Sequence, residues 1–225
     1  VKTHMGRQIV GEMKNLTIKK EAGKWCASIQ VESETEIKEH PKPFSMVGID
    51  LGVKRFATLS NGAVVEPLSA YRKYEKKLAQ AQVNLFRRVK GSQGRAEARL
   101  KVQKIHKKIS RMRQDFLHKA SHWIAKNHGI VVLEDLQIVN MSKSAKGTVE
   151  EPGRNVRAKA GLNKSILDQG WGEFKRQLEY KLAWFGGELH TVPAHYTSQA
   201  CSECKHVDAR NRPSQAKFQC ISCGF

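Results

Sequence analysis

Acidic residues, aromatic residues and cysteines are all scarce in this 225-residue sequence. It contains 21 Asp and Glu against 40 Lys and Arg, which gives a formal net charge of +19, and only 7% of its residues are aromatic. No stretch approaches the roughly 20 consecutive apolar residues that cross a bilayer. No charged and apolar leader of the secretory type is evident either. The sequence therefore predicts a cytoplasmic protein without a membrane partner.

The excess of positive charge predicts a polyanionic partner, and nucleic acid is the commonest one. The alternative is that the charge serves solubility, but ordinary small domains carry a net charge of only about 2–8. The hydrophobic content of 40% is enough for a core and excludes a wholly disordered chain. At roughly 100–200 residues per domain, the length allows one full domain with an appendage or two small domains.

Four of the five cysteines form two CxxC pairs, Cys201 with Cys204 and Cys220 with Cys223, with 15 residues between the pairs. Two such pairs can surround one ion tetrahedrally, because each offers two sulfurs from one tight turn. The spacing predicts a structural zinc ribbon in a reducing compartment and not a disulfide framework. Four protein ligands leave no open position for water, so this zinc would not be catalytic. The isolated Cys26 is interpreted as a small structural residue.

Residues in the first third of the chain alternate between apolar and polar with period two, which predicts strands. Residues 8–32 show this alternation around a turn at 21–24, as in a β-hairpin. Residues 44–66 contain two apolar runs followed by an Asn-Gly pair that favours a tight turn. The first of these runs ends at Asp50, which is therefore expected on the first strand of a β-meander.

Apolar residues spaced three and four apart predict two long helices, over residues 69–90 and 95–128, that form an antiparallel hairpin. Basic residues crowd between the apolar stripes, and few acidic residues offset them. Such a face is self-repulsive unless an anion neutralises it, which favours nucleic-acid contact over a merely solvated surface. The predicted nucleic-acid-binding residues are Arg87, Arg88, Lys90, Arg95, Arg99, Lys104, Lys107, Lys108, Arg111 and Arg113.

A second carboxylate follows a buried strand at residues 130–134, an apolar run that is typical of a central strand and ends on Glu134. Asp50 and Glu134 therefore each end a strand, where an uncompensated carboxylate is costly. Binding Mg²⁺ would compensate both charges, and carboxylates around such ions hydrolyse phosphodiesters. Taken singly, a strand-end acid is also a common turn former, and that alternative stays open.

The segment after Glu134 is predicted to contain a loop, a helix and a strand. Residues 140–164 are polar and basic and are expected to form a mobile loop, 165–185 a helix, and 189–192 a further strand. His118 and His122 have an i, i+4 spacing that suits a metal, but without a third ligand nearby they are interpreted as packing or RNA-contact residues.

Several motifs, in order along the chain, resemble those of the TnpB proteins (OrfB family), which are transposon-encoded RNA-guided DNA nucleases related to the type V CRISPR effectors. The first of these motifs, GIDLGV, also resembles the first motif of RuvC-type RNase H-like nucleases. The matching segments are residues 48–53 (GIDLGV), 56–62 (FATLSNG), 115–121 (DFLHKAS), 132–136 (VLEDL), 168–171 (DQGW), 178–181 (LEYK) and 196–199 (YTSQ).

The resemblance implies an α/β fold built on an RNase H-like (RuvC) mixed sheet. The nuclease domain would span residues 44–195 and carry the helical hairpin at 69–128 as an insertion. Residues 1–40 would be a partial β-barrel, the end of a wedge-like oligonucleotide-binding domain. Residues 196–225 would be the zinc ribbon.

The resemblance also implies a reaction and its partners. Asp50 and Glu134 would be catalytic residues that jointly hold Mg²⁺, and the protein would be an RNA-guided, Mg²⁺-dependent DNA endonuclease of a transposable element. Its partners would be a guide RNA and a target DNA. The helical hairpin would face the guide RNA or the guide–target duplex through the backbone, because base pairing reads the sequence.

The sequence departs from the family pattern in one respect. The family has a third catalytic Asp just beyond the zinc ribbon, and this sequence does not include that segment. Asp168 and Asp208 do not end strands in the right order, so neither is expected to replace it. The sequence is therefore interpreted as an incomplete core with little nuclease activity alone. One alternative is a catalytically inactive RNA- or DNA-binding module, such as a repressor derived from a truncated transposase. The other is a strand-transferring DNA transposase, for which neither a His–hydrophobe–His motif nor a suitably placed tyrosine stands out.

Overall fold

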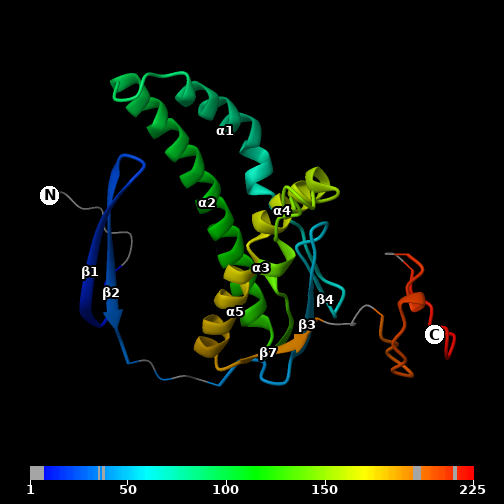
Figure 1. Ribbon diagram of the computed structural model, residues 1–225. Helices are drawn as coiled ribbons and strands as arrows, with labels where there is room; N and C mark the ends of the chain where they lie inside the picture. The colour runs from blue at the N-terminus through cyan, green and yellow to red at the C-terminus, as the bar shows by residue number, and fades with distance from the viewer. Residues whose placement is uncertain (1–7, 35, 37–38, 195–198, 215–216) are drawn as a thin grey trace.

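The computed structural model describes residues 8–34, 36, 39–194, 199–214 and 217–225 (Figure 1). Its elements are β1 (Glu12–Glu21), β2 (Lys24–Glu32), β3 (Met46–Leu51), β4 (Ala57–Leu59), β5 (Val64–Val65), α1 (Ala70–Phe86), α2 (Gln93–Asn127), β6 (Ile130–Asp135), α3 (Ile138–Met141), α4 (Val156–Gln169), α5 (Trp171–Phe185), β7 (Glu188–Pro193) and the 3₁₀ turn Ala209–Asn211. No helix in the described part of the chain is both long and apolar enough to cross a membrane.

The largest sheet has five strands in the order β5-β4-β3-β6-β7. The β3–β4 and β4–β5 pairs are antiparallel, whereas the β3–β6 and β6–β7 pairs are parallel, so the sheet is mixed. The predicted meander over residues 44–66 is confirmed. The predicted central position of the 130–134 strand is also confirmed, because β6 pairs on one side with β3 and on the other with β7.

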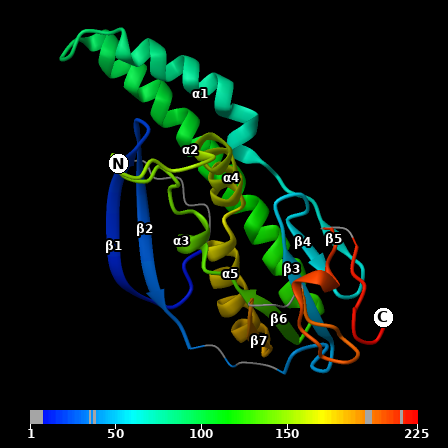
Figure 2. The ribbon, with the colours of Figure 1, turned by 45° about the vertical axis from the view of Figure 1, so that its right-hand side comes forward.

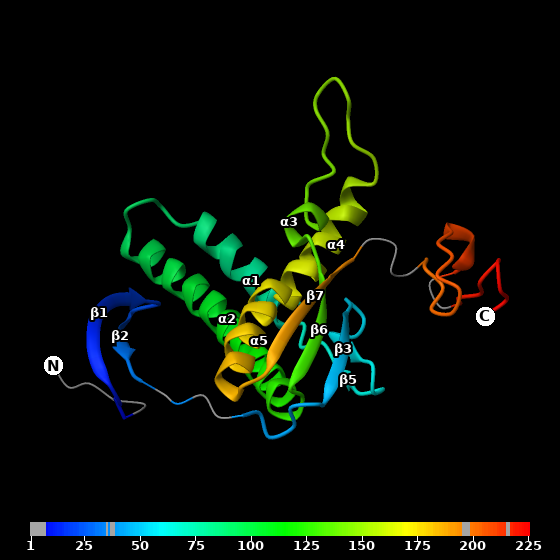
Figure 3. The ribbon, with the colours of Figure 1, turned by 90° about the horizontal axis from the view of Figure 1, so that it is seen from below.

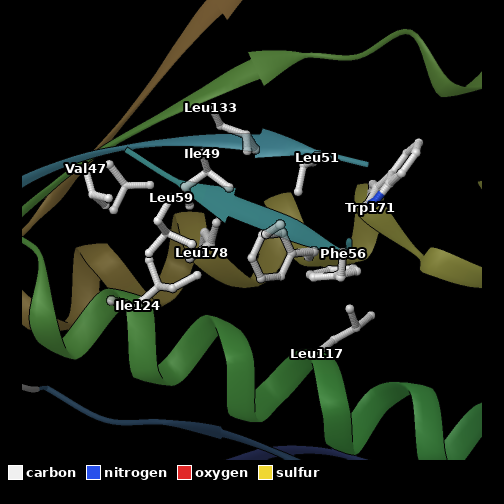
Figure 4. Close-up of a cluster of buried hydrophobic side chains, with 14 of the residues drawn as sticks. Val47, Ile49, Leu51, Phe56, Leu59, Leu117, Ile124, Leu133, Trp171 and Leu178 are labelled. Atoms are coloured by element: carbon white, nitrogen blue, oxygen red, sulfur yellow. The ribbon is translucent and has the colours of Figure 1, made fainter. Parts of the chain in front are cut away.

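One face of this sheet packs on α2 and α5 and forms the core (Figure 4). Alternate strand residues such as Val47, Ile49 and Leu133 are buried there. The ring of Phe56, just before β4, is central to the packing, since it meets the rings of Phe116 and Phe174 edge to face, each with its centroid 4.9 Å away. Period-two alternation places the intervening residues of β3 and β6 on the opposite face of the sheet.

The long helical hairpin predicted between the strands is present as α1 and α2. Figure 2 shows the two helices extending together beyond the sheet. Both ends of α1 lie inside the predicted range, which ran from residue 69 to 90, because Arg87 already caps the helix. The α2 helix begins at Gln93, after Ser92, whose side-chain oxygen accepts a hydrogen bond from the Arg95 N–H and so caps the helix.

The first hairpin, β1 and β2, forms a separate two-stranded antiparallel sheet beside α2 (Figure 1). The predicted turn is confirmed, with Ala22 and Gly23 at positive φ. Its apolar face is largely exposed, with Trp25 70% and Ile18 62% accessible. No further strand pairs with this hairpin in the described ranges, so the partial barrel stays a prediction.

The segment between β6 and β7 differs from the prediction in two ways. Residues 140–164 are not one loop, because α4 already begins at Val156 and leaves only 142–155 between the helices; Figure 3 shows this shorter loop extending away from the sheet. The predicted helix over 165–185 is in fact two helices. They divide at Gly170, which has φ of +75°. A side chain there would crowd Arg113 and Leu117 of α2, since a Cβ would lie 3.1–3.2 Å from their carbons.

A buried carboxylate joins the helical hairpin to the rest of the fold. Asp168, at the end of α4, accepts hydrogen bonds from the backbone N–H of Tyr71 at the start of α1, at 3.0 Å. Its Oδ1 also accepts a 2.9 Å hydrogen bond from the guanidinium of Arg113 on α2. The Asp168 side chain is only 5% exposed, so three helices converge on a charge that water hardly reaches.

We expect Asp168→Asn to lower the free energy of unfolding by about 2 kcal/mol, because it removes the buried negative charge that the partly exposed Arg113 guanidinium pairs with and leaves a weaker, neutral acceptor. The matched control is Asp115→Asn, which breaks an exposed i, i+4 pair with Lys119 and should cost less than about 0.5 kcal/mol. Urea unfolding measures both; equal losses would show that the junction does not stabilise the fold.

A second expectation concerns pH. Burial, followed by the charges of Lys42 and His40, lowers the pKa of His128 from its usual 6.5. Below that pH the unfolded chain binds a proton that the folded chain resists, so the free energy of unfolding falls as the pH decreases. We expect His128→Asn to reduce this slope in urea unfolding between neutral and mildly acidic pH; an unchanged slope would contradict the assignment.

Candidate functional site

The two carboxylates singled out in the sequence lie side by side in the sheet. Residues 46–49 of β3 pair in parallel register with 130–133 of β6, and the last pair is Ile49 with Leu133. Asp50 and Glu134 follow these partners directly, one on each strand. Because Ile49 and Leu133 are both buried in the core, the next residues both belong to the opposite face.

The surroundings of the carboxylate pair are open. Asp50 is exposed and Glu134 is half-buried. Thr58 is the partner of Asp50 on β4, and Val192 is the partner of Glu134 on β7, so one row crosses the sheet at this level. Two adjacent carboxylates on an open face offer the oxygen ligands that Mg²⁺ prefers, and this donor set fits the expected ion.

The next acid along β6 has a different role. Asp135 accepts a 2.7 Å hydrogen bond from the Lys175 ammonium on α5. This contact, together with the Lys175 charge, lowers the pKa of Asp135. The pair ties the end of β6 to α5. Asp135 is therefore engaged in an ion pair with α5, a role that the sequence pattern did not reveal.

The four C-terminal cysteines converge as predicted. Their sulfurs all lie within 4.8 Å of one another, and Cys201 to Cys223 and Cys204 to Cys220 are 3.6 and 3.5 Å apart. Four sulfurs bonded to one zinc at about 2.3 Å would be about 3.8 Å apart in a tetrahedron. The cluster therefore fits a metal ion such as zinc. It is the only group of three or more such ligands found among the described residues, so His118 and His122 belong to no such group.

The two cysteine turns have the same backbone construction. In the first, the Lys205 N–H donates to the Cys201 carbonyl at 3.0 Å, and in the second the Gly224 N–H donates to the Cys220 carbonyl at 3.0 Å. Lys205 and Gly224 both have positive φ. The sequence did not reveal this conformation at position 205, since a lysine gives no sign of it.

Asn211 joins the two turns and was also missed. It is fully buried, its side-chain amide donates to the carbonyls of Gln199 and His206, and its oxygen accepts from the Ile221 N–H. Nearby, the Asp208 carboxylate forms an ion pair with the Arg210 guanidinium, at a distance of 2.9 Å. A buried asparagine in a polar segment could have been suspected only from its position between the cysteine pairs.

Two thiols of the cysteine cluster have shifted pKa values. Backbone N–H groups of Cys223 and Ser222 point at the Cys220 sulfur and lower the pKa of that thiol to about 6. At Cys223 a backbone hydrogen bond from Phe225 lowers the pKa, but hydrogen bonds with the other cysteine sulfurs and burial raise it overall to about 12. The thiolate, which is the metal-binding form, is thus favoured at Cys220 and opposed at Cys223 in the metal-free cluster.

We expect one zinc ion per chain by elemental analysis, lost in Cys204→Ser and retained in Cys26→Ser, which removes the cysteine outside the cluster. Chelation should increase proteolysis within residues 199–225 and leave the five-stranded sheet intact, because the metal stabilises only its own segment. Equal zinc content in both variants would contradict the site.

The predicted basic residues fall into two groups. Three are engaged within the protein: Arg95 donates to the carbonyls of Leu85 and Arg88, Lys107 pairs with Glu21, and Arg113 with Asp168. The others are exposed along the α1–α2 hairpin and its tip, and they are Arg87, Arg88, Lys90, Arg99, Lys104, Lys108 and Arg111.

Two protein-family models match this chain. The family model OrfB_IS605, described as "Probable transposase", matches residues 28–145, more than half of the chain. The model of the Cas12f1-like TNB domain matches residues 171–225, which include all four cysteines of the cluster.

Among curated proteins, the Escherichia coli K12 protein named "Putative RNA-guided DNA endonuclease InsQ" is 52% identical over 214 residues, 95% of this chain and 53% of that protein. A "Putative RNA-guided DNA endonuclease" of Streptomyces pristinaespiralis is 33% identical over 90% of this chain and 46% of its own length. The chain thus spans about half the length of these relatives.

A solved structure of a Cas12f1–sgRNA–target DNA complex has a similar fold, with a TM-score of 0.55 and 18% identity over 88% of this chain and 40% of that one. The mixed α/β architecture is therefore shared with a known structure. Since the OrfB_IS605 model covers more than half of the sequence, the chain belongs to the OrfB (TnpB-type) family.

Proposed function

We propose that this chain is the core of an RNA-guided, Mg²⁺-dependent DNA endonuclease, with the five-stranded sheet acting as an RNase H-like (RuvC) nuclease domain. The observation that carries the proposal is the register of β3 and β6, which brings Asp50 and Glu134 together on one open face. The names of the relatives, RNA-guided endonucleases, agree with this chemistry.

Asp50 and Glu134 would hold the magnesium. When bound, Mg²⁺ ions stabilise the charge that develops as a phosphodiester is displaced in line. The chain contributes the oxygen ligands and a fixed strand geometry, in which β6 is paired with β3 on one side and with β7 on the other. The described residues contain no third carboxylate grouped with these two, so we expect the chain alone to cleave weakly.

The other parts of the chain would bind nucleic acid or support the nuclease domain. The segments 1–40, 44–195 and 196–225 would be the end of a wedge-like barrel, the nuclease domain and a zinc ribbon with a structural ion. Guide RNA and target DNA would be the partners, with the basic residues of the α1–α2 hairpin contacting their backbones. The large net charge of +19 supports a polyanionic partner.

The test is a chimera in which this chain replaces the matching 214 residues of InsQ. With guide RNA and Mg²⁺, we expect it to cleave a target plasmid. Asp50→Ala and Glu134→Ala should each lower the rate by about 100-fold or more, since the metal clamp supplies several kcal/mol of transition-state stabilisation. Asp208→Ala, which removes an acid of the cysteine-rich segment, is the matched control.

Cleavage that persists in Asp50→Ala would overturn the proposal. A chimera that binds guide RNA and target DNA without cutting either strand would instead favour the second candidate, a catalytically inactive binding module or repressor.

A further inference from the structure

A short turn carries two adjacent cations at the end of the sheet where the carboxylate pair lies. The turn joins β3 to β4 and contains Lys54 and Arg55. It follows Asp50 by a few residues and leads to Thr58, the partner of Asp50 on β4. Because only three positions separate Arg55 from Thr58, their Cα atoms are at most about 11 Å apart. The two cations are thus close neighbours of the proposed nuclease site.

The backbone of this turn is fixed against the core on both sides of the cations. The Gly52 N–H donates to the Phe56 carbonyl at 3.3 Å and so closes the turn. Val53 packs against the main hydrophobic cluster, and Phe56 is fully buried in it (Figure 4). Lys54 and Arg55 lie between these two anchors and are the exposed residues of the turn. The fold therefore sets their backbone positions before any ligand binds, which reduces the entropic cost of binding.

These cations are also free of internal partners. None of the ion pairs found in the described part of the chain involves Lys54 or Arg55. The lysine at the start of α5 differs, since Lys175 is engaged by Asp135. Two adjacent like charges repel each other, and an anion that lies beside both relieves the repulsion.

The neighbouring acids create a need for such cations when the substrate is DNA. Asp50 and Glu134 share the open face of the sheet, and their charges repel the phosphates of a DNA strand. The proposed metal site offsets this repulsion only at the phosphate that is cut, so the phosphates on either side need other cations. A guanidinium can bind a phosphate with two parallel hydrogen bonds, and an ammonium binds one as a point charge.

We infer that Lys54 and Arg55 bind the phosphates next to the cut in the DNA strand that is cleaved, and thereby position the reacting phosphodiester over Asp50 and Glu134. The inference rests on the proposed function and extends it, because that function assigns nucleic-acid contacts to the α1–α2 hairpin and none to the β3–β4 turn. The two cations act on the position of the substrate and do not hold the metal.

The test uses the chimera with InsQ, its guide RNA and Mg²⁺, and measures the single-turnover rate of target cleavage. The test variant is Lys54→Gln with Arg55→Gln. The matched control is Lys42→Gln with Lys126→Gln, which removes two exposed charges at the opposite end of the sheet, near the starts of β3 and β6. In a second arm, each of the two phosphates that flank the cut is replaced in turn by an uncharged methylphosphonate.

We expect the test variant to lower the rate by about 10-fold, because charged hydrogen bonds to the substrate are lost. The control should lower it by less than about 2-fold, since distant exposed charges are screened. At one flanking position the methylphosphonate should slow the unmodified chimera by a similar factor. In the test variant the same replacement should have little further effect, because the charge that it removes has already lost its partner.

Two further readouts separate substrate positioning from damage to the site. The Mg²⁺ concentration that gives half the maximal rate and the thermal unfolding temperature should both be unchanged in the test variant, since its two side chains are exposed and hold no metal. A large rise in the required Mg²⁺ concentration would overturn the inference, because the cations would then act on the metal site.

An unchanged rate in the test variant, or a methylphosphonate effect that multiplies with that of the test variant, would also overturn the inference. An equal loss in the control would do the same, since it would show a general charge effect. Failure of the nuclease proposal gives a different result, because Asp50→Ala would then still cleave the target whatever the turn variants do.

Discussion

The parallel pairing of β3 with β6 is the constraint on which the account depends. It joins strands separated in sequence by two long helices, and its register leaves no freedom in which residues become neighbours. With Ile49 beside Leu133 in the core, the following residues Asp50 and Glu134 must lie together on the other face. A shift of one residue on either strand would bury one carboxylate and separate the pair.

Repulsion between the exposed basic residues of the α1–α2 hairpin destabilises the fold, and other interactions have to offset it. The attachment of the hairpin depends on buried α2 residues such as Leu117 and Ile124, together with polar contacts near its base. Asp168 is the clearest of these, because one buried carboxylate holds the start of α1 and the side of α2. Asp135 adds a more exposed ion pair between the end of β6 and Lys175 of α5. Acids in this protein are few, and these two hold parts of the fold in place while Asp50 and Glu134 stay on the open face of the sheet.

Local patterns predicted the features that local chemistry determines. The strands, the long helical hairpin and the cysteine cluster follow from period, turn residues and CxxC spacing, which depend on neighbouring residues alone. The start of α4 was missed because its first turns are polar and resemble a loop. The division at Gly170 was missed because a glycine is compatible with a helix until α2 packs against it.

The parts of the site that the sequence did not predict depend on contacts between residues far apart in the chain. Arg95, Lys107 and Arg113 have the same local surroundings as the exposed basic residues of the hairpin, yet each has a partner elsewhere in the protein. Asn211 and Asp168 likewise gain their roles from groups that only the folded chain brings near. The juxtaposition of Asp50 and Glu134 was expected from strand ends together with the family resemblance, and the register supplied the physical reason for it.

The central claim, that two strand-end carboxylates share one metal site, is tested most directly by locating a bound ion. Crystals of this chain soaked in Mn²⁺ give an anomalous signal at the metal position. The account predicts a peak in contact with carboxylate oxygens of both Asp50 and Glu134, at oxygen–metal distances of about 2.0–2.2 Å as for small divalent ions. A peak on only one of the two side chains, or none at this edge of the sheet, would contradict it.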